Sequence, residues 1–101
     1  MSEQPIVVQV DADLEDLVPS YLASRLADVT ALRARLDRDD LEPVRIVGHS
    51  MKGTGGGYGF DEITKIGAAI EQAARDGDRT ALATQIDRLE DYLTRLEVAY
   101  E

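Results

Sequence analysis

The sequence has 101 residues, which is enough for one domain with a single modest hydrophobic core. It carries 11 Lys and Arg against 20 Asp and Glu, and the resulting net charge of −9 disfavours binding to nucleic acid or to an anionic membrane surface. The chain contains no cysteine, which excludes disulfides, thiolate zinc sites and cysteine nucleophiles, and no apolar run approaches the roughly 20 residues that cross a membrane.

The N-terminal segment, residues 1–12, is predicted to form an extended arm. It lacks the basic start and long apolar stretch of a signal peptide, so we expect a cytoplasmic protein. Residues Ile6–Val10 are mostly β-branched and favour extended backbone, but the sequence offers no obvious second strand to pair with them. We therefore expect the arm to lie across the domain, with a short strand or a helical turn as the alternative.

The first helix is predicted to run from about Asp16 to Leu36, with Pro19 tolerated in its first turn. A polar connection follows, in which Asp39 or Asp40 is the expected N-cap of the second helix. The apolar residues of the first helix recur at helical spacing and are expected to share one face: Leu22, Leu26, Val29 and Leu36.

Two further helices are predicted after residue 60. Asp61 is the expected cap of a helix that ends at Asp76, because Gly77 suits the left-handed residue that closes a helix. Asp78 is the expected cap of the last helix. The apolar seam of that helix continues almost to the end of the chain, through Leu82, Ile86, Leu89, Leu93, Leu96 and Tyr100.

Four amphipathic helices joined by short loops predict an all-α fold, an up-down-up-down four-helix bundle with an extended N-terminal arm. A coiled coil is the rival interpretation for the last helix alone. Residues 1–101 are then expected to form a single domain.

The second helix carries the only histidine of the chain, His49. A helical projection places His49 opposite a predicted core stripe and therefore in solvent. The stripe consists of Val44, Val47, Met51 and Tyr58. The projection places near the imidazole, or at the margin of its face, the residues Glu42, Arg45, Ile46, Lys52, Gly53 and Gly56.

Five glycines lie between Gly53 and Gly59. Each disfavours a helix interior by roughly 1 kcal/mol relative to alanine, so stability alone does not explain them. A glycine beside an exposed imidazole leaves room for a partner, whereas a simple loop after Lys52 explains Gly55 to Gly59 well and Gly53 poorly. Their order fits neither a phosphate-binding loop nor a dinucleotide fingerprint, and one histidine offers no metal-ligand spacing.

Residues 48–53 (GHSMKG), with Gly59 ten positions after His49, resemble the histidine-containing phosphotransfer (HPt) domain. The resemblance continues through residues 70–78 (IEQAARDGD), which look like the third helix of that family and the turn after it. The first and fourth helices match only by their amphipathic pattern. The run of glycines at 55–57 departs from the family pattern and leaves open where the second helix ends within Gly55–Gly59.

The resemblance implies a phosphorelay carrier in a two-component system, with His49 as the residue that is phosphorylated and Lys52 as a nearby cation. The expected partners are a response-regulator receiver domain, a hybrid sensor histidine kinase, or both. Magnesium and the catalytic carboxylates would belong to the receiver, so we expect no cofactor in this chain and no enzyme activity of its own. The expected docking surface around His49 consists of Arg45, Ile46, Gly53 and Gly56.

The chemistry of the residues agrees with that role. A neutral imidazole is a ready nucleophile at pH 7, and an ammonium such as Lys52 favours transfer of an anionic group. Two alternatives remain at this point. One is an adaptor bundle in which His49 is an incidental surface residue, and the other is a domain phosphorylated only by a separate ATP-dependent kinase.

Overall fold

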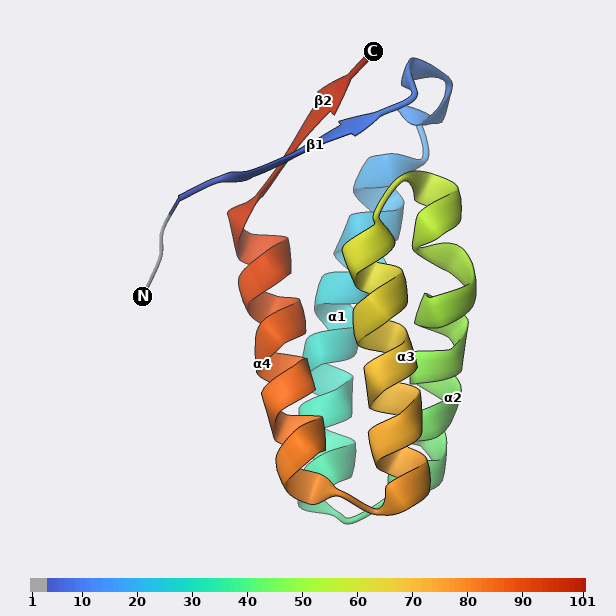
Figure 1. Ribbon diagram of the computed structural model, residues 1–101, viewed down its shortest axis with the longest axis vertical. Helices are drawn as coiled ribbons and strands as arrows, with labels where there is room; N and C mark the ends of the chain where they lie inside the picture. The colour runs from blue at the N-terminus through green and yellow to red at the C-terminus, as the bar shows by residue number, and fades with distance from the viewer. Residues whose placement is uncertain (1–3) are drawn as a thin grey trace.

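The computed structural model describes residues 4–101, so the first three residues of the predicted arm lie outside the described part. Figure 1 shows four helices side by side, each running opposite to the one before it, which confirms the predicted all-α up-down-up-down bundle. In chain order the elements are β1 (Ile6–Val10), the 3-10 turn η1 (Ala12–Leu14), α1 (Val18–Asp37), α2 (Leu41–Thr54), the 3-10 turn η2 (Gly56–Tyr58), α3 (Asp61–Asp76), α4 (Arg79–Arg95) and β2 (Leu96–Tyr100).

The ends of the last two helices follow from their capping residues. Gly77 closes α3 in the left-handed conformation, with φ of 66°, as its position predicts. The Asp78 carboxylate accepts a hydrogen bond from the backbone N–H of Ala81 at 3.0 Å and caps α4, which is also as predicted. The expected cap at Asp61 is wrong by one residue, because Phe60 occupies the cap position and Asp61 is the first helical residue.

The core lies along the axis of the bundle and receives side chains from all four helices. On α1 the predicted face is partly wrong, because Leu26 is 48 % exposed. Tyr21 and Leu32 are buried in its place, and they lie on the other side of Val29 from Leu26. The apolar residues at helical spacing therefore predict the helix correctly, but they predict the wrong centre for its buried face.

The largest correction concerns the two ends of the chain. The last helix ends at Arg95, and residues Leu96–Tyr100 form β2, which pairs in parallel with β1 from Ile6↔Leu96 to Val10↔Tyr100. The N-terminal arm is extended as predicted, but it does have a partner strand, and Figure 1 shows the resulting ribbon beyond the end of the bundle. The residues of β2 alternate between half-buried and exposed, which is strand periodicity, although Leu96 and Tyr100 also satisfy helical spacing.

None of the helices within the described residues is long and apolar enough to cross a membrane.

Candidate functional site

The second helix ends at Thr54, which settles where it stops within the glycine-rich stretch. Gly55 is the cap residue, η2 follows, and Gly59 adopts φ of 93°, a left-handed value that favours glycine. Gly53 therefore lies inside the helix, as the helical projection assumes. Gly56 lies beyond the helix end, so the projection that placed it near the imidazole does not apply to it.

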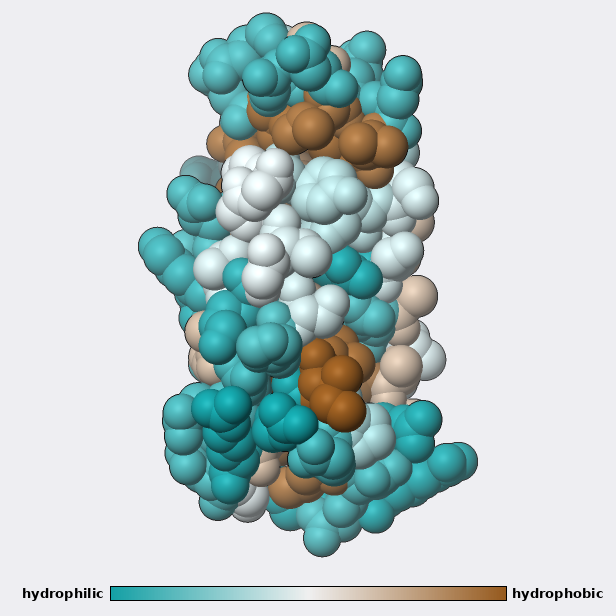
Figure 2. Space-filling view, turned by 90° about the vertical axis from the view of Figure 1, so that its right-hand side faces the viewer, coloured by the Kyte–Doolittle hydropathy of each residue, from teal (hydrophilic) through white to brown (hydrophobic). Residues whose placement is uncertain are grey.

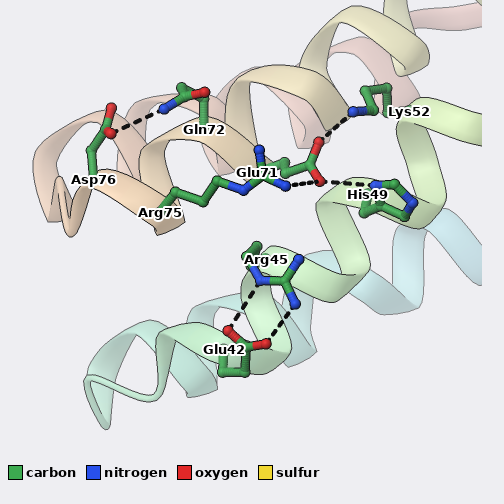
Figure 3. Close-up of polar contacts among 8 residues, drawn as sticks. All are labelled: Glu42, Arg45, His49, Lys52, Glu71, Gln72, Arg75 and Asp76. Atoms are coloured by element: carbon green, nitrogen blue, oxygen red, sulfur yellow. Dashed lines mark hydrogen bonds and ion pairs between the residues drawn. The ribbon is translucent and has the colours of Figure 1, made fainter.

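His49 projects from the outer side of α2, with 66 % of its side chain exposed, as the sequence predicts. Its Nδ1 atom lies 2.8 Å from Oε2 of Glu71, a residue of α3 that is 22 positions away in sequence. Figure 3 shows the other ring nitrogen pointing away from this contact. One nitrogen is thus held by the protein, and the other is open to an incoming group.

Glu71 is buried, with only 4 % of its side chain exposed, and it is held by three basic side chains. Lys52 donates from Nζ to Oε1 at 2.6 Å, while Arg75 donates from Nη2 to Oε2 at 3.3 Å. The pKa of Glu71 is lowered to about 2, chiefly by the hydrogen bond from Lys52 and next by that from His49. Burial acts in the opposite direction and raises the pKa. The carboxylate is therefore ionised at neutral pH despite its buried position.

An ionised carboxylate only accepts hydrogen bonds, so the proton between Glu71 and His49 belongs to Nδ1 of the ring. In a neutral imidazole with a proton on Nδ1, the lone pair that can react is on Nε2. The contact with Glu71 thus selects both the orientation and the tautomer of His49. The arrangement presents a nucleophilic Nε2 atom to solvent.

The other residues predicted around His49 lie as follows. Arg45 pairs with Glu42 on the same helix, donating from Nε to Oε2 at 3.0 Å, and Ile46 is 54 % exposed. A Cβ atom on Gly53 would meet nothing within 4 Å in the described part of the chain. Gly56 instead donates its backbone N–H to Thr64 at the start of α3. Arg45, Ile46, Lys52 and Gly53 lie within about one helical turn of His49 on α2, whereas Gly56 belongs to η2.

Figure 2 views the molecule from the side of α2 and shows small hydrophobic patches separated by hydrophilic surface. Of the predicted core stripe of this helix, Val44 and Met51 are fully buried and Val47 is half-buried. Tyr58 belongs to η2 and stacks on Tyr21 of α1, with 4.1 Å between the ring centroids.

Among the described residues no cluster of three His, Asp or Glu side chains could hold a metal ion.

Comparison with protein families finds a match to the Hpt domain over residues 12–99. The chain belongs to the Hpt family. No curated protein and no solved structure shows a significant match. An Hpt domain is a phosphoryl carrier in two-component signalling, and it interacts with receiver domains and kinases of these systems.

Glu71 is not among the site residues predicted from the sequence, although a signal for it exists. In this Hpt domain Glu71 lies on the face of α3 that carries the buried residues Gly67, Ile70 and Ala74. A charged residue on a buried helical face needs partners, because an unpaired charge there is strongly unfavourable. Those partners are His49 and Lys52 of the preceding helix and Arg75 of α3 itself.

Proposed function

We propose that His49 is the phosphorylated residue of this domain. Its Nε2 atom would attack the phosphorus of a phospho-aspartate on a receiver domain, or of the phosphoryl donor of a histidine kinase, and later pass the group to a receiver. The single observation that carries this proposal is the contact of Nδ1 with the buried Glu71 carboxylate, which leaves Nε2 exposed as the reactive nitrogen.

The bonds formed and broken in the transfer, and the resulting charges, can be followed atom by atom. As the N–P bond to Nε2 forms, the P–O bond to the donor breaks and the donor oxygen leaves with its electron pair. The imidazole then carries Nδ1–H and the phosphoryl group, and its ring becomes positively charged. The negative charge of Glu71 at 2.8 Å from Nδ1 stabilises that cation. The return transfer to a receiver reverses these steps and restores the neutral ring.

Lys52 acts in two ways in this proposal. Its ammonium holds Glu71 at 2.6 Å, and it remains 40 % exposed on the side of His49. An ammonium has three N–H donors, so Lys52 can retain Glu71 and still attract an oxygen of the transferred group. Lys52 therefore supports both the orientation of the imidazole and the charge that develops during transfer.

The partner would dock over the exposed residues around His49, namely Arg45, Ile46 and Gly53. The surface combines a cation, an exposed apolar side chain and a position without a side chain, which suits close approach of an acidic active site. The magnesium ion and the catalytic carboxylates would be those of the receiver, and we propose no cofactor for this chain. Residues 1–101 would act as one domain.

The test uses the wild-type protein and His49→Gln, each incubated with phosphorylated receiver domains and, separately, with a histidine kinase and labelled ATP. We expect acid-labile, base-stable label on the wild type and none on the variant. The variant should stay folded, because His49 is mostly exposed and Lys52 and Arg75 still hold the carboxylate of Glu71; thermal melting checks this.

The pattern of labelling separates the alternatives. Label from a receiver supports the relay, because it shows that His49 accepts a phosphoryl group from a receiver, whereas label from the kinase alone would restrict the domain to a kinase substrate. Acid-labile label that persists on a folded His49→Gln protein would show that another residue is the acceptor. A wild type that takes no label from any partner would favour an adaptor.

A further inference from the structure

Helices α2 and α3 approach each other closely where Gly48 faces Gly67. A Cβ atom on Gly48 would lie 2.7 Å from the backbone nitrogen of Glu71 and 2.9 Å from the carbonyl oxygen of Gly67. A Cβ atom on Gly67 would lie 2.5 Å from the backbone nitrogen of Lys52 and 2.8 Å from the carbonyl oxygen of Gly48. Side-chain carbons do not approach backbone atoms this closely, so these two positions require glycine at the observed helix separation.

The two glycines lie against the backbone of the two residues that build the site. Gly48 makes room for the backbone of Glu71, and Gly67 makes room for the backbone of Lys52. Gly48 directly precedes His49, and Gly67 lies one helical turn before Glu71. The helix contact therefore occurs at the point where one carboxylate must reach two groups on the other helix.

The hydrogen bonds of Glu71 leave little tolerance for a wider separation. They measure 2.8 Å to His49 and 2.6 Å to Lys52. Raising the contact at Gly67 to an ordinary carbon–atom separation of about 3.5 Å would move the helices apart by about 1 Å. A hydrogen bond lengthened by that amount falls outside the useful range, which ends near about 3.2 Å.

We propose that the contact between Gly48 and Gly67 positions Glu71 against His49 and thereby fixes the Nδ1–H tautomer of the imidazole. This inference rests on the proposed function of His49. Neither glycine touches the transferred group, so both are positioning residues that act through Glu71.

Gly55 provides a matched control for this inference. A Cβ atom there would lie 2.6 Å from the backbone nitrogen of Thr64 and 2.9 Å from the carbonyl oxygen of Phe60. Gly55→Ala thus forces a backbone clash of similar severity between the end of α2 and the start of α3. Thr64 precedes Glu71 by about two helical turns, so this clash is remote from the site.

The experiment records the ring nitrogen chemical shifts of His49 by NMR at pH 8 in 15N-labelled protein. Because His49 is the only histidine, its signals need no assignment against others. We expect the wild type to show the Nδ1–H tautomer, Gly67→Ala to show a mixture of tautomers, and Gly55→Ala to retain the wild-type pattern. Transfer from a phosphorylated receiver should fall about tenfold in Gly67→Ala and stay within about twofold of wild type in Gly55→Ala.

Several outcomes would overturn the inference. A wild type with mainly Nε2–H contradicts it directly, and so does a folded Gly67→Ala protein with the wild-type tautomer and rate. Equal losses in Gly55→Ala and Gly67→Ala would show general packing rather than positioning. If Gly67→Ala does not fold, Gly48→Ala tests the same contact from the other helix.

The readouts also separate this inference from the proposed function. A wild type that shows the Nδ1–H tautomer but accepts no phosphoryl group would reject the function. The tautomer comparison would still decide whether the glycines position the ring.

Discussion

The two sides of the bundle are built in different ways. Helices α2 and α3 meet through glycines, which bring backbone against backbone and enclose the carboxylate of Glu71. Helices α1 and α4 contain no glycine, and their buried positions are filled mainly by large side chains such as Leu32, Ile86 and Leu89. Helix α3 also buries large side chains, such as Ile63, Ile66 and Ile70, but the pair of α2 and α3 adds a close contact of backbone against backbone.

The polar contacts between helices differ in the same way. Between α1 and α4, Arg33 pairs with Asp87 and Glu90 at the surface, where such pairs contribute little to stability. Between α2 and α3, the carboxylate of Glu71 is buried and its direction is fixed by its partners. All four helices contribute buried side chains to the core, and the pair of α2 and α3 in addition determines the geometry of the site.

The largest effect on stability is expected from Leu89→Ala in α4. Leu89 is fully buried, and a leucine-to-alanine change in a core typically lowers the free energy of unfolding by about 2–5 kcal/mol. The rate of phosphotransfer at a temperature where the variant is folded should remain that of wild type. Chemical denaturation and a transfer assay on one preparation measure both quantities.

Leu26→Ala on α1 is the control, because Leu26 is about half exposed and should lose little stability. If Leu89→Ala slows transfer while it is fully folded, the two pairs of helices are not independent and the comparison fails.

The next largest effect is expected from Gly53→Gln on the exposed side of α2. Gly53 lies in the helix and a Cβ atom there would meet nothing within 4 Å among the described residues, so stability should be preserved or raised by up to about 1 kcal/mol. The added side chain stands beside His49, where reacting atoms must come within about 3 Å, so transfer should slow at least about tenfold. Thermal melting and transfer kinetics are the measurements.

Ala83→Gln, on the exposed surface of α4, is a matched control that should change neither quantity. A stable Gly53→Gln protein with wild-type transfer would show that the partner docks on another face.

Much of the fold follows from local signals in the sequence. The caps at Gly77 and Asp78, the buried Val44 and Met51 and the exposed His49 all depend on residues close together in the chain, where helical periodicity is informative. The pairing of β1 with β2 does not follow from local signals, because it joins the two ends of the sequence. Leu96 and Tyr100 fit a helix and a strand equally well, and only the presence of the partner strand decides between them.

The site shows the same limit. The sequence identifies His49 and Lys52 because they are neighbours on one helix. Glu71 depends on the separation of two helices, which in turn depends on Gly48 and Gly67 facing each other. The sequence alone does not show that these glycines are contact points between helices, since a glycine also suits a turn or an exposed surface.

A smaller effect is expected from Lys52→Ala. The variant removes the ammonium that holds Glu71 and that can attract the transferred group. We expect the stabilisation of the transition state to fall by on the order of 1 kcal/mol, which slows transfer a few-fold to about tenfold. Transfer should slow without stopping, because Arg75 still contacts Glu71. The measurement is the transfer rate at low and at high salt.

Lys65→Ala removes the same charge from an exposed position of α3 and should leave the rate unchanged. Wild-type rates for Lys52→Ala at both salt concentrations would remove Lys52 from the mechanism and leave the orientation of His49 to Glu71 alone.

A change in acid stability rather than in transfer rate is expected from Glu71→Gln. Contacts with Lys52 and His49 lower the pKa of Glu71 from its ordinary value of 4.5 to about 2, so the folded protein keeps this carboxylate ionised where the unfolded chain is already protonated. Its contribution to stability is therefore complete above pH 4.5 and is lost as the pH falls towards 2. Gln cannot titrate, so the difference in melting temperature between wild type and variant should be constant above that window and shrink within it.

Glu62→Gln sharpens this test, because Glu62 also has a lowered pKa, caused chiefly by a hydrogen bond from Arg88 of α4. Glu62 is 41 % exposed, so the contribution of its ion pair to stability should be small and should fall further at high salt. Glu71 is itself buried, although its partners are partly exposed, so its ion pairs should be screened less. Equal pH and salt responses of the two variants would mean that Glu71 behaves as a surface carboxylate. The contrast between a site enclosed by α2 and α3 and a solvated exterior would then not hold.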